Sequence, residues 1–86
     1  MQLDILTPER KVFTGNVYGV ILPGTEGVFE ILEHHAPIIA SLGKGKMKVF
    51  KDKNKTGVDT YEISGGFIEM ANNKASVLIE DAKVIE

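Results

Sequence analysis

Residues 46–64 read KMKVFKDKNKTGVDTYEIS, in which two runs of alternating apolar and polar residues flank a turn-rich centre. Met47 and Val49 alternate with lysines, and Tyr61 and Ile63 alternate with polar residues. Successive side chains of a β-strand point to opposite faces of the sheet, so this period of two is typical of strands with one solvated face. The centre, rich in Lys, Asn and Gly, indicates a turn between two antiparallel strands.

The same period of two extends over most of the chain. Leu3 and Ile5 alternate with polar residues, and Val77 and Ile79 repeat the pattern near the C-terminus. Residues 31–40 could be read as a helix, but proline lacks an amide donor and favours extended geometry in the residue before it, so Pro37 predicts loop and strand. Many short strands between glycine-rich turns predict an all-β fold, either a flattened sandwich or a barrel.

Length and composition limit the possible functions. The 86 residues fit one small domain, and we expect residues 1–86 to form it without a separate catalytic half. The net charge of −2 argues against a nucleic-acid binder driven by phosphate contacts. The sequence contains no cysteine, which excludes a disulfide scaffold and a thiolate zinc site and favours a reducing compartment. We expect neither a secretory leader nor a membrane-spanning helix, because the apolar runs are too short.

The motifs that would support catalysis or metal binding are incomplete. His34 and His35 are adjacent, and in an extended chain their side chains would point to opposite faces, so they are a poor chelating pair. The glycines on either side of Lys44 lack the spacing of a phosphate-binding loop. Ser64 lacks the helix that follows the nucleophile of a serine hydrolase. We therefore expect no catalytic residue, no bound metal and no cofactor.

Six of the nine lysines lie between residues 44 and 55. We interpret them as a solvated strand edge, since binders of single-stranded nucleic acid interleave stacking aromatic residues and only Phe50 is present here. The triplet Lys46-Met47-Lys48 resembles the lysine hairpin of biotinyl and lipoyl carrier domains. In those carriers the modified lysine lies at an exposed turn apex, whereas the alternation here places the lysines along a strand. A carrier domain is the alternative function class.

The stretch from Gly24 to Leu42 combines a glycine-rich turn with many apolar residues. Val28 falls at the turn, where we expect it to be exposed, and an exposed apolar turn beside charged residues is typical of a protein contact. The other large apolar side chains of this stretch are expected in the core, namely Phe29, Ile31, Leu32, Ile38, Ile39 and Leu42.

Three motifs, in this order, resemble the epsilon subunit of F-type ATP synthases, which is called delta in mitochondria. The first is the glycine turn at 24–27, followed by an acidic and apolar run and by His-Ala-Pro at 35–37. The second reads ISGGFIEM at 63–70, the third reads VLIEDA at 77–82, and the opening residues 3–7 also match. Each motif alone is weak, but their order and spacing along the whole chain make the resemblance specific.

The resemblance implies a flattened, ten-stranded antiparallel β-sandwich at the foot of the central stalk. There it would act as a non-catalytic rotor subunit that links the gamma subunit to the membrane c-ring and couples proton flow to ATP synthesis. It implies a peripheral location on the cytoplasmic face of the bacterial inner membrane, or on the matrix or stromal side in an organelle. By motif position, the c-ring contact comprises Glu26, Gly27, Val28 and Phe29, and the gamma contact comprises Thr7, His35 and Ala40.

Two features depart from the family pattern. The usual glycine in the acidic and apolar run is Glu30 here, which fills a position that is normally open and can alter how that strand meets its neighbours. The C-terminal helical hairpin of the family, which restrains ATP hydrolysis and in some members binds ATP, has no counterpart before Glu86. We therefore expect neither activity from these residues.

Overall fold

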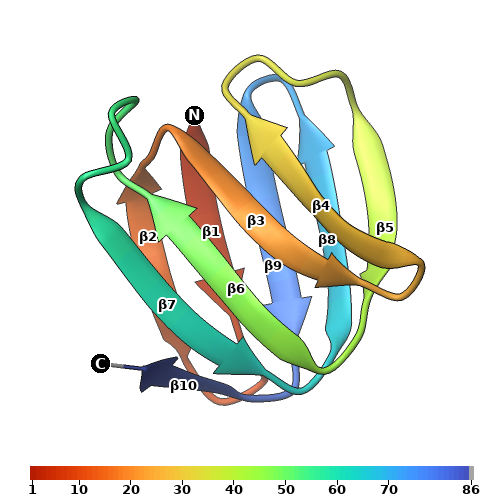
Figure 1. Cartoon of the computed structure of the whole chain (residues 1–86). Coiled ribbons are helices and arrows are strands. Elements are labelled where there is room, and N and C mark those ends of the chain that lie inside the picture. Colours follow the sequence, from red (N-terminus) through yellow and green to blue (C-terminus); the bar gives the residue numbers. More distant parts are fainter. Residues whose placement is uncertain (86) are drawn as a thin grey trace.

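The computed structural model describes residues 1–85, which form ten β-strands joined by short connections (Figure 1). The strands are β1 (Gln2–Leu6), β2 (Lys11–Asn16), β3 (Gly19–Gly24), β4 (Gly27–Leu32), β5 (Ile38–Leu42), β6 (Gly45–Phe50), β7 (Val58–Ile63), β8 (Gly66–Ala71), β9 (Lys74–Ile79) and β10 (Ala82–Ile85). Within these described residues there is no helix, and hence none suited to crossing a membrane. The prediction of an all-β, ten-stranded fold is confirmed.

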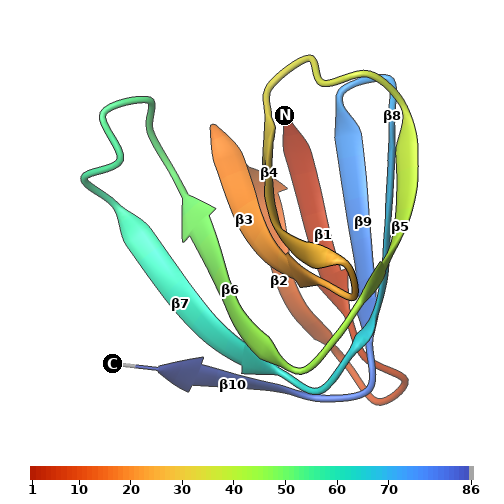
Figure 2. The same cartoon turned by 45° about the vertical axis from the view of Figure 1, so that its right-hand side comes forward.

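The strands form two layers that face each other (Figure 2). We name them sheet I, with the strand order β4-β3-β6-β7-β10, and sheet II, with the order β5-β8-β9-β1-β2. The layers are joined where Gly24 at the end of β3 lies opposite Leu42 at the end of β5. Each sheet therefore has one face toward the other sheet and one face toward solvent.

The core lies between the sheets and follows from the period of two. Met47 and Val49 of β6 and Tyr61 and Ile63 of β7 are buried, while the residues between them are exposed on the outer face of sheet I. Strands β1, β8 and β9 of sheet II contribute inward side chains in the same way. Burying one large aliphatic side chain contributes about 1.5–3 kcal/mol, so this apolar layer is the main source of stability.

One strand pair differs from the predicted antiparallel arrangement. β1 and β9 run parallel, with Leu3 opposite Ala75 and Ile5 opposite Val77. An alternating pattern indicates which face of a strand is buried, but it carries no information on the direction of the neighbouring strand. The other strand pairs of residues 1–85 are antiparallel, as predicted.

The apolar stretch that includes β4 and β5 differs in part from expectation. Val28 is 74% exposed, which confirms its position at the surface, and Ile31 and Leu42 are buried as predicted. Ile39 is 72% exposed, so the prediction that it belongs to the core is wrong. The residues on either side of Ile39 face inward, and a strand alternates, so Ile39 has to face solvent. Half-burial is found for Phe29, Leu32 and Ile38.

Candidate functional site

The β3–β4 hairpin ends in a turn that carries the residues assigned to the c-ring. Thr25 and Glu26 form the turn, and Gly27 follows it with φ of 130°, a conformation that side chains other than glycine rarely adopt. The amide of Thr25 donates to the carbonyl oxygen of Ser41 at 3.0 Å. This bond holds the turn against the end of β5.

The hairpin turn and β5 line a shallow groove, which we name the tip groove. Its walls are residues 24–29 of the hairpin and residues 38–41 of β5. The four residues assigned to the c-ring thus lie together, and the exposed side chains of Val28 and Ile39 both border the groove. Two exposed apolar side chains beside the carboxylate of Glu26 suit contact with another protein.

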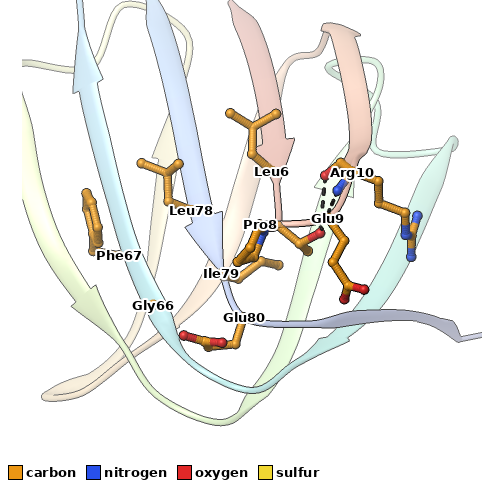
Figure 3. A pocket seen from close by; sticks show the side chains of 10 residues that line it. Leu6, Pro8, Glu9, Arg10, Gly66, Phe67, Leu78, Ile79 and Glu80 are labelled. Carbon is orange, nitrogen blue, oxygen red and sulfur yellow. Dashed lines mark hydrogen bonds between the residues drawn. The ribbon is translucent and has the colours of Figure 1, made fainter.

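A second candidate surface lies on the outer face of sheet II. Phe67 of β8 lies opposite Leu78 of β9, and Leu78 lies opposite Leu6 of β1. We name these three side chains the outer stripe, because they form an apolar row across three strands (Figure 3). Together with residues 7–10 of the β1–β2 turn, the outer stripe lines an open groove.

The family motifs do not indicate the outer stripe as a surface, although the sequence contains a signal for it. Val77, Leu78 and Ile79 are three consecutive apolar residues, so one of them has to occupy the face that the alternation reserves for polar residues. Phe67 and Ile68 are a similar apolar pair. What the sequence does not supply is the register that places these outward residues next to Leu6.

The three residues assigned to the gamma contact do not lie together. Thr7 is in the β1–β2 turn at the groove of the outer stripe, where its hydroxyl is 3.2 Å from both the amide and the carbonyl oxygen of Arg10. His35 is in the β4–β5 loop, at the opposite end of sheet II from that turn (Figure 1). Ala40 is half-buried on β5 and borders the tip groove instead.

The two adjacent histidines take part in separate hydrogen bonds, His34 through its backbone amide and His35 through its ring. The amide of His34, whose φ is 63°, donates to the side-chain oxygen of Asn73 at 2.8 Å. The Nδ1 atom of His35 lies 2.6 Å from the carbonyl oxygen of Ala36, which requires the tautomer that donates from Nδ1. No group of three His, Cys, Asp or Glu side chains suited to a metal ion is found within residues 1–85.

Asp4 lies at the centre of a small polar network on the outer face of sheet II. Its Oδ1 atom accepts a hydrogen bond from the Thr14 hydroxyl at 2.6 Å and another from the Gln2 amide at 3.1 Å. The ammonium of Lys74 lies 4.0 Å from its other oxygen. The bonds from Thr14 and Gln2, with the charge of Lys74, lower the pKa of Asp4 below its usual value of 3.8. The charged carboxylate therefore ties β1 to β2 and β9.

We expect this network to make stability depend on pH. A carboxyl group with a lowered pKa in the folded state adds stability above its unfolded pKa, and that contribution is lost as the pH falls through the folded pKa. Asp4→Asn should therefore lower the free energy of unfolding by about 1 kcal/mol at pH 7, and the difference from wild type should vanish as the pH falls below 3.8. Urea titrations over a pH series measure it. Thr14→Val removes the hydroxyl that donates to Asp4 and should reproduce part of the destabilisation. If Asp4→Asn lowered the free energy of unfolding equally at every pH, the pH dependence would not come from the Asp4 carboxylate.

The lysine-rich segment forms the β6–β7 hairpin, and two of its lysines are paired. The ammonium of Lys51 lies 3.0 Å from the Asp59 carboxylate, and that of Lys55 lies 3.0 Å from the Glu30 carboxylate. Lys55 also lies over the ring of Phe50, 4.9 Å from its centroid. At Glu30 the register between β4 and β3 is regular and the side chain is exposed, so the departure from glycine leaves the strand pairing intact and adds a link between β4 and the β6–β7 turn.

The link between Glu30 and Lys55 should contribute little to stability. Both side chains are partly exposed, and exposed ion pairs typically contribute about 0.2–1 kcal/mol. A double-mutant cycle of Glu30→Gln and Lys55→Met, followed by urea unfolding, should give a coupling energy in that range. The coupling should fall toward zero in about 1 M salt, where screening is strong. A coupling that survives high salt would show that the pair is more than a surface contact.

The chain is similar to known subunits of ATP synthases. A family model described as the β-sandwich domain of the ATP synthase delta/epsilon chain matches residues 1–85. The ATP synthase epsilon chain of Chlorobium limicola is 44% identical over 81 residues, which cover 93% of this chain and 89% of that protein. The epsilon chain of Chlorobaculum tepidum is 42% identical over 80 residues, which cover 92% of this chain and 88% of that protein.

Solved structures share the fold at low sequence identity. A chain of the Euglena gracilis mitochondrial ATP synthase, in a structure of its OSCP, F1 and c-ring, superposes with a TM-score of 0.85 at 20% identity. A chain from the central stalk and c-ring of the Tetrahymena thermophila enzyme has a TM-score of 0.80 at 16% identity. Both alignments cover 95% of this chain, which spans 51% of the Euglena chain and 64% of the Tetrahymena chain.

Proposed function

Because the chain belongs to the family of ATP synthase delta/epsilon β-sandwich domains, we propose that it is a rotor-stalk subunit of a proton-translocating ATP synthase. In this role it joins the gamma subunit to the membrane c-ring and couples proton flow to ATP synthesis without catalysing a reaction itself. It lies peripherally at the membrane, on the cytoplasmic side in a bacterium or on the matrix or stromal side in an organelle.

The observation that carries this proposal is the extent of the family match. It covers residues 1–85 rather than a single motif. Two relatives named as epsilon chains are covered over most of their own length as well. A likeness that runs from one end of a protein to the other supports a shared role better than a shared motif does.

A rotor subunit needs a stiff body and two contacts, rather than a reactive group. The side chains between the two sheets are apolar and buried, and protein interiors of this kind are close-packed and resist deformation. Each sheet is held by hydrogen-bonded ladders, and the Thr25–Ser41 bond holds the hairpin turn to β5. Torque applied at one surface can thus be passed to another surface of the same domain.

We assign the two contacts to the two surfaces described above. The tip groove, with Glu26, Gly27, Val28 and Phe29, is assigned to the c-ring. The outer face of sheet II is assigned to the gamma subunit. Its outer stripe supplies the apolar area, and Thr7 lies in the turn beside it. His35 lies at the other end of sheet II and Ala40 borders the tip groove, so the assignment of these two residues to gamma is supported by motif position alone.

The proposal is tested by binding to the two partners. The purified chain is incubated with the gamma subunit of the same ATP synthase and with detergent-solubilised c-ring, and complexes are isolated through a tag on either partner. We expect the chain to bind both and to form a ternary complex. A chain that bound neither, under conditions where the complete synthase assembles, would refute the proposal.

A further inference from the structure

Glu69 lies on the outer face of sheet II, and no ion pair is found for it within residues 1–85. It lies on β8 between the buried residues Ile68 and Met70, so its side chain points away from the core. Its cross-strand neighbours are Ile39 of β5 and Ser76 of β9. Phe67 of the outer stripe is two positions away on the same strand and therefore on the same face. Directly across the sheet the carboxylate thus meets one apolar and one small polar side chain, and Lys74 lies at the diagonal position on β9.

The described part of the chain provides no cation for Glu69. No nitrogen of a Lys, Arg or His side chain of residues 1–85 lies within 4.0 Å of its carboxylate. Lys74 on the adjacent strand β9 is directed toward Asp4. On sheet I, the carboxylates of Glu30 and Asp59 each have a lysine at 3.0 Å, whereas Glu62, like Glu69, has no such pair among the described residues.

Glu69 lies two positions beyond Phe67 on the same face of β8, so a partner that covers the outer stripe and extends along β8 also covers Glu69. A carboxylate removed from water without a countercharge is strongly unfavourable, whereas a charge pair across an interface adds specificity. We infer that the partner of this face carries a basic side chain that pairs with Glu69, flanked by apolar side chains that pack on Phe67 and Leu78. This inference rests on the proposed function, in which the occupant is the gamma subunit, and it adds the chemistry by which gamma would be recognised.

The test compares matched variants of the full chain for binding to the purified gamma subunit by calorimetry. Glu69→Gln keeps the size of the side chain and removes its charge, and we expect binding to weaken at least about tenfold at low salt. Glu62→Gln is the matched control, because Glu62 is an exposed glutamate on β7 whose neighbours Ile63 and Tyr61 face the core, so it lies on the outer face of sheet I. We expect it to bind like wild type. Leu78→Asp places a charge on the outer stripe and tests whether gamma binds this face at all.

The outcomes separate the inference from the proposed function. Loss of affinity in Glu69→Gln and Leu78→Asp, with a weaker salt dependence in Glu69→Gln than in wild type, supports the basic partner side chain. Loss in Leu78→Asp alone overturns the inference and leaves the gamma contact in place. If wild type binds gamma and neither variant loses affinity, gamma binds elsewhere. Both the inference and the assignment of the outer face of sheet II to gamma are then wrong. If wild type does not bind gamma, the proposed function itself is refuted. Far-ultraviolet circular dichroism of each variant confirms that it is folded.

Discussion

Val28→Asp should detach the chain from the c-ring without unfolding it. Val28 is 74% exposed and contributes little to the core, so the free energy of unfolding should stay within about 0.5 kcal/mol of wild type. At an interface the new carboxylate would lose its hydrating water and would lie near the carboxylate of Glu26. Disrupting an apolar anchor residue of an interface typically costs about 2 kcal/mol or more of binding free energy. We therefore expect affinity for the isolated c-ring to fall about thirtyfold.

Val84→Asp provides the matched control for this experiment. Val84 is also a valine on the surface, 67% exposed, but it lies on β10, whose residues do not line the tip groove. The same substitution there should leave ring affinity unchanged. Equal losses in the two variants would mean that added negative charge, rather than the tip groove, determines binding. Normal ring binding by Val28→Asp would remove the ring contact from the hairpin turn.

The strands and the core could be predicted from the sequence because both depend on local alternation. The β6–β7 hairpin is the clearest case, since a turn-rich segment separates two runs with the same period. Ile39 marks the limit of this reasoning. In a stretch with apolar residues at successive positions, composition alone does not tell which of them faces the core, and the alternation of β5 decides it.

The two candidate surfaces depend on contacts between distant parts of the chain, which a period of two cannot specify. The outer stripe joins Leu6 to Leu78 through the parallel pairing of β1 with β9, and the sequence pattern predicted no parallel pair. The tip groove was easier to anticipate, because Glu26 to Phe29 are consecutive and an exposed apolar turn is a local signal. The residues transferred by motif to the gamma contact include Ala40, whose position beside the tip groove could be known only from the packing of β5 against the hairpin.

Gly66→Ala should destabilise the fold more than any other substitution considered. Gly66 begins β8 with φ of 146°, a conformation that costs other residues about 1–3 kcal/mol. A Cβ atom there would clash with the carbonyl oxygen of Leu78 and would lie 2.9 Å from the Cα atom of Ile79. Both are backbone atoms of the neighbouring strand, so relief requires β9 to move away from β8. We expect a loss of about 4 kcal/mol, which is large for a domain of this size.

Gly27→Ala separates the two causes of that loss. Gly27 also has a positive φ, 130°, but a Cβ atom there would have no atom within 4 Å. Gly27→Ala should therefore show the conformational cost alone. The free energies of unfolding of the two variants, measured by urea titration, should differ by the free energy needed to displace β9. Because Leu78 belongs to the outer stripe, any Gly66→Ala protein that remains folded should also bind the gamma subunit more weakly than Gly27→Ala. Equal unfolding free energies for the two variants would mean that β9 can shift freely, which a domain that transmits torque through this sheet could not permit.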